Sequence, residues 1–181
     1  MSKQTDLQTA RVQRIMATLH VAEPSKVVRF DADAMTADVQ PLVMREIDGV
    51  MATAPQLVAV PVLTLCAADW YIRPWYKPGD VGLLIYCDQD IDTALAGEVA
   101  EPGTNRQHSM SDAVFVGGLW LKGNVPDGLP DDALVIGTGS QRVEITRSVI
   151  SITGTLRLNG VNLGSHTHTA PEGGGTTSGP Q

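Results

Sequence analysis

The sequence has few aromatic residues, no basic cluster and no long apolar run. Aromatic residues make up only 4% of the 181 residues. No stretch approaches the roughly 20 apolar residues that a membrane-spanning helix requires. The chain carries 13 Lys and Arg residues against 20 Asp and Glu residues, a formal net charge of -7, and its basic residues are scattered. We therefore expect no nucleic-acid partner and no electrostatic adhesion to anionic lipid.

Enzyme motifs and a signal peptide are also missing. The sequence has no phosphate-binding Gly-rich loop with Lys, no Gly-x-Ser-x-Gly and no His-Glu-x-x-His, so we expect no catalytic activity. Residues 1–20 are polar and amphipathic, unlike a signal peptide. The two cysteines, Cys66 and Cys87, lie in apolar runs. We expect them to be reduced core residues of a protein made in the cytoplasm.

Glycine and proline are frequent, with 18 and 11 residues, and they divide the chain into short apolar segments. This pattern predicts an all-β fold after a short helix over residues 5–20. Strands are predicted at residues 26–30, 36–43, 56–66 and 81–87, with Pro61 marking an edge or a bulge and a type II turn at 77–80. Such spacing favours a small barrel like that of the oligonucleotide/oligosaccharide-binding (OB) fold.

We divide the chain into five segments. A predicted connector at residues 101–132 contains one short helix, which begins near Ser111–Phe115 with Ser109 or Ser111 as its cap. The full division is an N-terminal helical segment (1–22), an OB-fold-like barrel (23–100), the connector (101–132), a trimeric β-helix (133–163) and an apex (164–181).

Short apolar triplets fill the C-terminal part of the chain. They are Val143–Ile145, Ile150–Ile152, Leu156–Leu158 and Val161–Leu163, and each predicts a very short strand with one apolar face. A segment of this size buries too little surface to be stable alone, and it has no cysteine to cross-link it. The simplest solution is a core shared by three identical chains wrapped about one axis.

A His-x-His pair follows these strands. In an extended segment His166 and His168 would point the same way, and imidazole is a common ligand of transition metals. One chain offers only these two ligands here, so a closed site needs ligands from symmetry copies. Continuing the alternation from Val161 and Leu163 would place Ser165 on the inner face instead. The prediction therefore needs a one-residue shift in phase, for which Gly164 is the obvious position.

Three other groups each allow two interpretations. Asp88–Asp92 imitates the start of a calcium loop, but a charged turn is favoured because the glycine and the closing glutamate are missing. His108 and Asp112, spaced i and i+4, could be an acid–base pair, but a structural role is favoured. Four aromatic residues could stack on sugars or bases, or could pack in the barrel and against a partner. They are Trp70, Tyr71, Trp75 and Tyr76.

Three stretches of the chain carry a family resemblance. The first is Lys77-Pro-Gly-Asp-Val-Gly-Leu-Leu-Ile-Tyr86 followed by Asp90-Ile-Asp92. The second is Arg106-Gln-His108-Ser-Met-Ser-Asp112-Ala113. The third is Gly164-Ser-His-Thr-His168 with Gly173-Gly-Gly-Thr-Thr-Ser-Gly-Pro180. They resemble the central spike proteins of contractile-tail bacteriophage baseplates, the membrane-piercing needles that include the Mu-like baseplate spike. The first stretch is similar to a barrel strand and turn of that family and the third to its tip, and the resemblance covers the chain from about residue 25 to the end.

The resemblance implies a homotrimer in the virion, at the tail tip. Its barrel would attach to the baseplate hub protein, its middle would be an intertwined triple-stranded β-helix, and its tip would pierce the host outer membrane. His166 and His168 of three chains would supply six nitrogens to one iron ion on the axis, an octahedral set that suits iron better than zinc. Nickel or cobalt would fit the same geometry.

Two other functions fit parts of the sequence. A trimeric receptor-binding or carbohydrate-binding tail fibre would use the aromatic group. A metalloenzyme would use His166 and His168 with an open coordination position.

Overall fold

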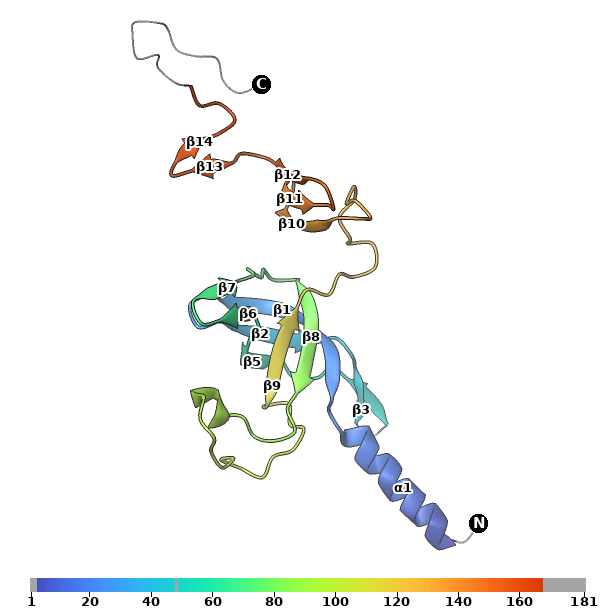
Figure 1. Cartoon of the computed structure of the whole chain (residues 1–181). Coiled ribbons are helices and arrows are strands. Elements are labelled where there is room, and N and C mark those ends of the chain that lie inside the picture. Colours follow the sequence, from blue (N-terminus) through green and yellow to red (C-terminus); the bar gives the residue numbers. More distant parts are fainter. Residues whose placement is uncertain (1–2, 48, 168–181) are drawn as a thin grey trace, which may run out of the picture. The chain divides into compact units, whose positions relative to one another are not determined.

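The computed structural model describes residues 3–47 and 49–167 and contains two compact units, residues 1–125 and 126–181 (Figure 1). Apart from one helix and one 3-10 turn (η1), the described elements are strands. No helix among the described residues is long and apolar enough to cross a membrane. The elements of the first unit are α1 (Lys3–Thr18), β1 (Ala22–Asp31), β2 (Thr36–Pro41), β3 (Arg45–Ile47), β4 (Val50–Ala52), β5 (Leu57–Pro61), β6 (Leu65–Ala67), β7 (Trp70–Ile72), β8 (Val81–Tyr86), η1 (Ala94–Ala96) and β9 (Ala113–Gly117).

The first unit is built on a curled five-stranded antiparallel sheet, a half-barrel with the order β5-β2-β1-β8-β9 (Figure 1). The edge strands β5 and β9 approach each other through a single parallel bridge between Val62 and Phe115. Beside it the Leu63 amide donates to the Phe115 carbonyl at 2.9 Å. The barrel expected from the sequence is therefore a half-barrel in this structure, with two short hairpins, β3–β4 and β6–β7, added to it.

Alternation along the strands produces the core. Val27, Val39, Leu84 and Phe115 are almost fully buried on the concave face, and Leu84 and Phe115 are directly paired across β8 and β9. The approach at Gly82 requires glycine, because a Cβ there would lie 2.4 Å from the Val116 carbonyl oxygen. The core thus depends on apolar residues spaced two apart, as expected for a sheet with one buried face.

Several local predictions are confirmed. Helix α1 and the strands at β1, β2, β5 and β8 occupy the expected positions. β5 is an edge strand that contains Pro61, and its pairing with β2 shifts register between Ala37 and Val39. Gly79 has a φ of 100°, and the Asp80 amide donates to the Lys77 carbonyl at 3.1 Å, as the predicted turn requires.

The predicted helix near Ser111–Phe115 is wrong. Ala113–Gly117 forms strand β9, which pairs with β8 along its whole length. Val114 and Val116 are β-branched residues that suit a strand, and Ala113 and Phe115 alternate with them into the core. The acidic and serine residues before the strand, which suggested a helix cap, instead belong to a hydrogen-bonded loop.

The prediction that both cysteines are core residues is also wrong. Cys66 is exposed on β6, in a hairpin that does not join the main sheet, and Cys87 is half-buried at the end of β8. Both are free thiols. Burial raises the pKa of Cys87, and the carboxylates of Asp112 and Asp88 add to this effect.

The second unit contains short antiparallel strands. Its described elements are β10 (Leu134–Thr138), β11 (Gln141–Ile145), β12 (Ile150–Thr153), β13 (Arg157–Leu158) and β14 (Val161–Asn162). Strands β10, β11 and β12 form one sheet, and β13 and β14 form a hairpin. The short strands predicted from the apolar triplets are confirmed.

Candidate functional site

The three-stranded sheet of the second unit has one largely apolar face, on which only the pair Thr138–Gln141 at one end is polar. Its register aligns two rows of side chains across the strands, and within each row the residues are direct cross-strand partners. The rows are Leu134–Ile145–Ile150 and Ile136–Val143–Ile152. The opposite face is polar, with Arg142 and Glu144 of β11 paired at 2.5 Å. The sheet therefore has the two-sided pattern of a strand layer that covers a core.

Among the described residues of the second unit, this apolar face covers no core. Ile150 is 68% exposed and Ile152 48% exposed, and none of the described residues 126–167 is buried. Five of the six aliphatic side chains are exposed and Val143 is half-buried, so the face gains little of the hydrophobic free energy that usually stabilises a sheet. An exposed apolar face of this kind is typical of a surface that contacts a partner.

A turn separates the last strand from the histidines. β14 ends at Asn162, whose side-chain oxygen accepts from the Gly164 amide at 3.1 Å, and whose carbonyl accepts from the Ser165 amide at 3.4 Å. The alternation of β14 therefore stops before His166. This interruption lies at the glycine where the sequence required a shift in phase.

His166 has a geometry that is compatible with metal binding. Its Nδ1 lies 2.8 Å from the Leu163 carbonyl oxygen, and because a carbonyl only accepts, Nδ1 carries the proton. The lone pair of the neutral ring is then on Nε2. Metal-binding histidines commonly donate their other ring N–H to a carbonyl in this way, so His166 fits the predicted role. The second predicted ligand, His168, lies outside the described residues.

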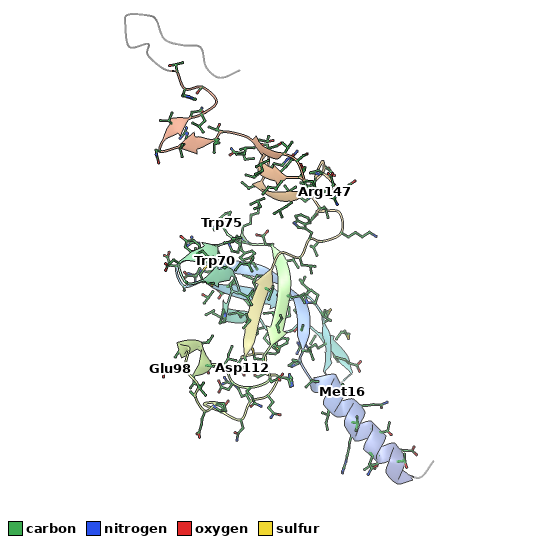
Figure 2. All side chains as sticks on the ribbon, in the orientation of Figure 1. Met16, Trp70, Trp75, Glu98, Asp112 and Arg147 are labelled. Carbon is green, nitrogen blue, oxygen red and sulfur yellow. The ribbon has the colours of Figure 1, made fainter. Side chains whose placement is uncertain are left out.

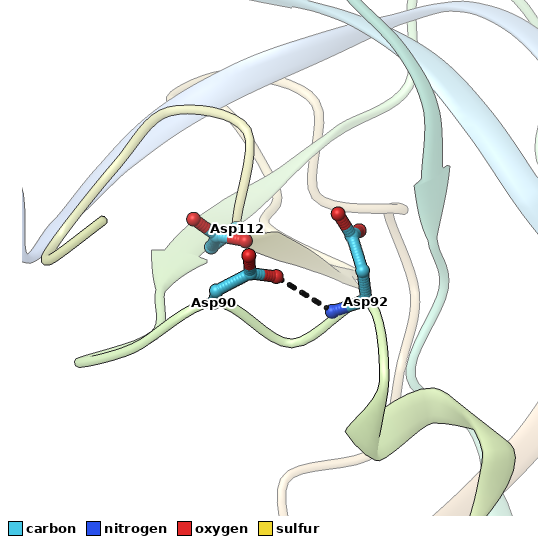
Figure 3. Close-up of side chains that lie close together, drawn as sticks. All are labelled: Asp90, Asp92 and Asp112. Atoms are coloured by element: carbon cyan, nitrogen blue, oxygen red, sulfur yellow. Dashed lines mark hydrogen bonds between the residues drawn. The ribbon is translucent and has the colours of Figure 1, made fainter. Parts of the chain in front are cut away.

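Three aspartates form an acidic cluster in the loop before β9 (Figure 3). Ligand oxygens of Asp90, Asp92 and Asp112 lie within 4.8 Å of one another, close enough to hold a metal ion. Asp90 and Asp112 are buried, whereas Asp92 is exposed. Arg106 also reaches this cluster, and its Nη2 lies 3.0 Å from Asp90, 3.0 Å from Asp92 and 2.9 Å from Asp112.

The Arg106 guanidinium occupies the position between the carboxylates that a metal ion would take. Its Nε also donates to Asp112 at 3.0 Å, which makes the contact with Asp112 bidentate. The Asp92 amide, the Thr104 hydroxyl and Arg106 hold the pKa of Asp90 below its usual value. The cluster therefore fastens the loop of residues 87–112 to the sheet, since the Asp112 carbonyl also accepts from the Cys87 amide.

The structure separates His108 from Asp112. His108 has a φ of 45°, which no helix contains, and its Nδ1 lies 3.7 Å from the exposed carboxylate of Asp88. Asp112 is instead the partner of Arg106. The two residues are not an acid–base pair. The structural role favoured for Asp112 and the charged turn favoured for Asp88–Asp92 both agree with this geometry.

A second polar cluster, which the sequence did not reveal, lies where α1 meets β1. Glu23 is buried, pairs with Arg45 at 2.5 Å and accepts from the Tyr86 hydroxyl. Arg45 also contacts both ring nitrogens of His20, at 3.1 and 2.9 Å. Burial lowers the pKa of His20, with a further contribution from Arg45. Burial and the Glu23 carboxylate raise the pKa of Tyr86.

Acidification should weaken the first unit through His20. Its pKa in the folded protein lies below the ordinary value of 6.5, so the unfolded chain binds more protons between the two values. The stabilisation is present above pH 6.5 and is lost as the pH falls through the folded pKa. We expect the urea concentration at the unfolding midpoint to decrease when the pH is lowered from about 7.5 to about 5, and to decrease more for the wild type than for His20→Gln. Equal slopes for the two proteins would contradict this assignment.

The four aromatic residues have separate environments. Tyr76 is partly buried and packs edge-on against Phe30 and Phe115. Trp70, Tyr71 and Trp75 are exposed, and Figure 2 shows both tryptophans near the β6–β7 hairpin. Only Tyr76 therefore has the barrel-packing role, and the other three form an exposed aromatic group.

The comparisons with known proteins cover the half-barrel and the loop of the acidic cluster. No curated protein matches the chain. Residues 23–118 match the family described as phage protein Gp138 N-terminal domain, and this match spans more than half of the chain. It begins at the buried Glu23, the second residue of β1, and ends directly after β9, so it includes all of the five-stranded sheet except Ala22. The chain belongs to the phage protein Gp138 N-terminal domain family.

Proposed function

We propose that this chain is a structural protein of the phage tail, and that three copies form the central baseplate spike that punctures the host outer membrane. The observation that carries the proposal is the exposed apolar face of the β10–β11–β12 sheet. Three such sheets about one axis would cover one another's faces and would leave the polar faces outside. The chain belongs to a family of phage proteins, which supports a location in the virion.

A spike of this kind needs stiffness. It crosses a membrane once under force, so its strength must come from buried interchain contacts along the shaft. Interchain pairing of strands also removes free sheet edges, which otherwise fray or aggregate. In this proposal the half-barrel of the first unit attaches the shaft to the baseplate hub protein.

The metal at the tip is part of the same proposal. His166 and His168 of three chains would hold one iron ion, and the hydrogen bond from His166 Nδ1 to the Leu163 carbonyl leaves Nε2 as the ligand atom. The ion would bind three chain ends that are otherwise prone to fray. Its binding free energy would add to the folding free energy of the tip.

Two measurements on the purified protein test this part of the proposal. Its mass in solution tests whether three chains assemble, and metal analysis tests whether the tip binds an ion. We expect a trimer with about one iron per three chains, and we expect His166→Ala to lose the metal while remaining trimeric. His108→Ala is the matched control, because it removes a histidine of the first unit, and it should retain the metal. A monomeric wild type, or a trimer whose metal content is the same in His166→Ala, would contradict the proposal.

Infection experiments test the piercing role itself. Virions with wild-type chains should admit a chromogenic substrate to a periplasmic β-lactamase soon after adsorption. Virions with His166→Ala chains should adsorb equally well and admit the substrate more slowly. Normal permeabilisation by these virions would argue against a role for the tip in puncture.

A carbohydrate-binding or receptor-binding tail fibre is the second candidate function. The exposed Trp70, Tyr71 and Trp75 favour it, because aromatic faces stack on sugars and anchor protein partners. It predicts saturable binding on a glycan array that Trp70→Ala and Trp75→Ala abolish. It also predicts that virions with these substitutions fail to adsorb, whereas the spike proposal predicts normal adsorption.

A further inference from the structure

The convex face of the half-barrel carries an apolar patch. The register between β1, β8 and β9 aligns two rows of outward side chains, none of which is buried. The rows are Ala22–Ile85–Val114 and Pro24–Leu83–Val116, and together they are called here the outer patch. Leu83 is 38% exposed and Ile85 45% exposed. All six residues are apolar, although they face away from the core.

The outer patch is confined to one part of the sheet. On the neighbouring strand β2 the outward residues are Asp38 and Gln40, and the Asp38 carboxylate accepts from the Ala59 amide. Polar outward residues are what a solvated antiparallel sheet normally carries. The change from polar to apolar between β2 and the other strands therefore makes the outer patch a candidate contact surface.

Helix α1 has a complementary apolar stripe on its C-terminal half. Val12, Ile15 and Met16 are spaced i, i+3 and i+4 and so share one side of the helix, and the exposed Leu19 follows directly after its end. Ile15 is 65% exposed and Met16, labelled in Figure 2, is 61% exposed. A helix of only 16 residues is marginally stable in water by itself. The stripe therefore also needs a covering surface.

The connection between α1 and β1 prevents the helix from covering the patch of its own chain. Val21 already pairs with β8, because its carbonyl accepts from the Tyr86 amide at 3.0 Å. The His20 ring is held by Arg45 and packs against Tyr86. Only Leu19 remains between the helix end at Thr18 and these fixed residues. Connections that reverse a helix onto a sheet usually need two to six residues that are free to turn, whereas two of the three connecting residues, His20 and Val21, are already held by other contacts.

We propose that α1 of each chain packs its apolar stripe on the outer patch of a neighbouring copy within the trimer. This inference rests on the proposed trimeric spike. Each chain carries one stripe and one patch, so a head-to-tail arrangement closes into a ring in which every stripe and every patch is covered. A separate partner such as the hub would have to cover both surfaces independently.

Photo-crosslinking of the full-length protein tests this arrangement. A benzophenone side chain introduced in place of Ile15 would lie within the stripe and would react with the surface that covers it. Irradiation should give covalent dimers and trimers on denaturing gels, and their peptide maps should join α1 to segments of the outer patch. The same probe in place of Gln13, an exposed residue on the other side of the helix, should give at least fivefold fewer such products.

Each other result would overturn the inference. Crosslinks to the patch that leave only monomer bands would show that the helix covers its own chain. Crosslinks from one α1 to another would show a helical bundle, and crosslinks only to added hub protein would show a different partner. The mass of the unirradiated protein is measured separately. A trimer without crosslinks to the patch refutes only this inference, whereas a monomer refutes the trimeric spike itself.

Discussion

Arg106→Leu will lower the melting temperature of the first unit by roughly 10 °C or more. The substitution removes the only described cation that contacts all three carboxylates of the acidic cluster. Asp90 and Asp112, both buried, then remain as uncompensated charges. Leaving one side of a buried ion pair without its partner costs far more than the pair itself contributes. Calorimetry or the loss of near-ultraviolet circular dichroism would measure the shift.

Arg29→Leu is the matched control for Arg106. Its guanidinium is largely exposed and lies 4.0 Å from the carboxylate of Asp31, so its loss should change the melting temperature little. A chelator should also leave the wild-type melting temperature of the first unit unchanged, because the Arg106 guanidinium already contacts all three carboxylates where a metal ion would bind. A large effect of the chelator would instead reveal a metal among the aspartates. A negligible effect of Arg106→Leu would show that the cluster does not hold the loop.

The local part of the fold was predictable from short-range sequence patterns. A short apolar run after a turn predicted β8, apolar residues spaced two apart predicted β12, and the Pro-Gly pair predicted the turn before β8. Each of these features depends on neighbours within a few residues. β9 was missed because its apolar run is short and follows serine and aspartate residues that also suit a helix cap. Pairing with β8, a distant segment, decides its structure.

The polar clusters were not predictable because they join distant segments. Arg106 contacts Asp90, which lies 16 positions earlier in the chain, and Arg45 contacts Glu23, which lies 22 positions earlier. Sequence spacing allowed His108 and Asp112 to pair, although a structural role was favoured, and in the structure Asp112 pairs with Arg106. The sequence offered one signal for them. A glutamate that falls within a buried strand, such as Glu23, almost always has a partner that carries a positive charge or donates a hydrogen bond. The His-x-His pair was visible because both ligands are adjacent in sequence.

Ile152→Asp should convert the proposed trimer into monomers. Ile152 lies in the row Ile136–Val143–Ile152 on the apolar face, which we propose as the inner wall of the shaft. Three copies of the substitution would place three carboxylates in one apolar core. Each desolvated carboxylate costs several kcal/mol, and the burial of the Ile152 side chain that it replaces is lost as well. Analytical ultracentrifugation would measure the loss of trimer, and proteolysis should then remove the second unit within a shorter time than in the wild type.

Thr153→Asp is the matched control for Ile152→Asp. Thr153 is the next residue of β12, so its side chain points to the opposite face, where its cross-strand partner is Arg142. A carboxylate there meets a positive charge and stays in water, so the trimer should persist. The two variants add the same negative charge at adjacent positions of β12. They therefore differ mainly in the face of the sheet on which the carboxylate lies. Trimers of equal stability in both variants would mean that the apolar face of β10–β11–β12 is not the surface that joins the chains.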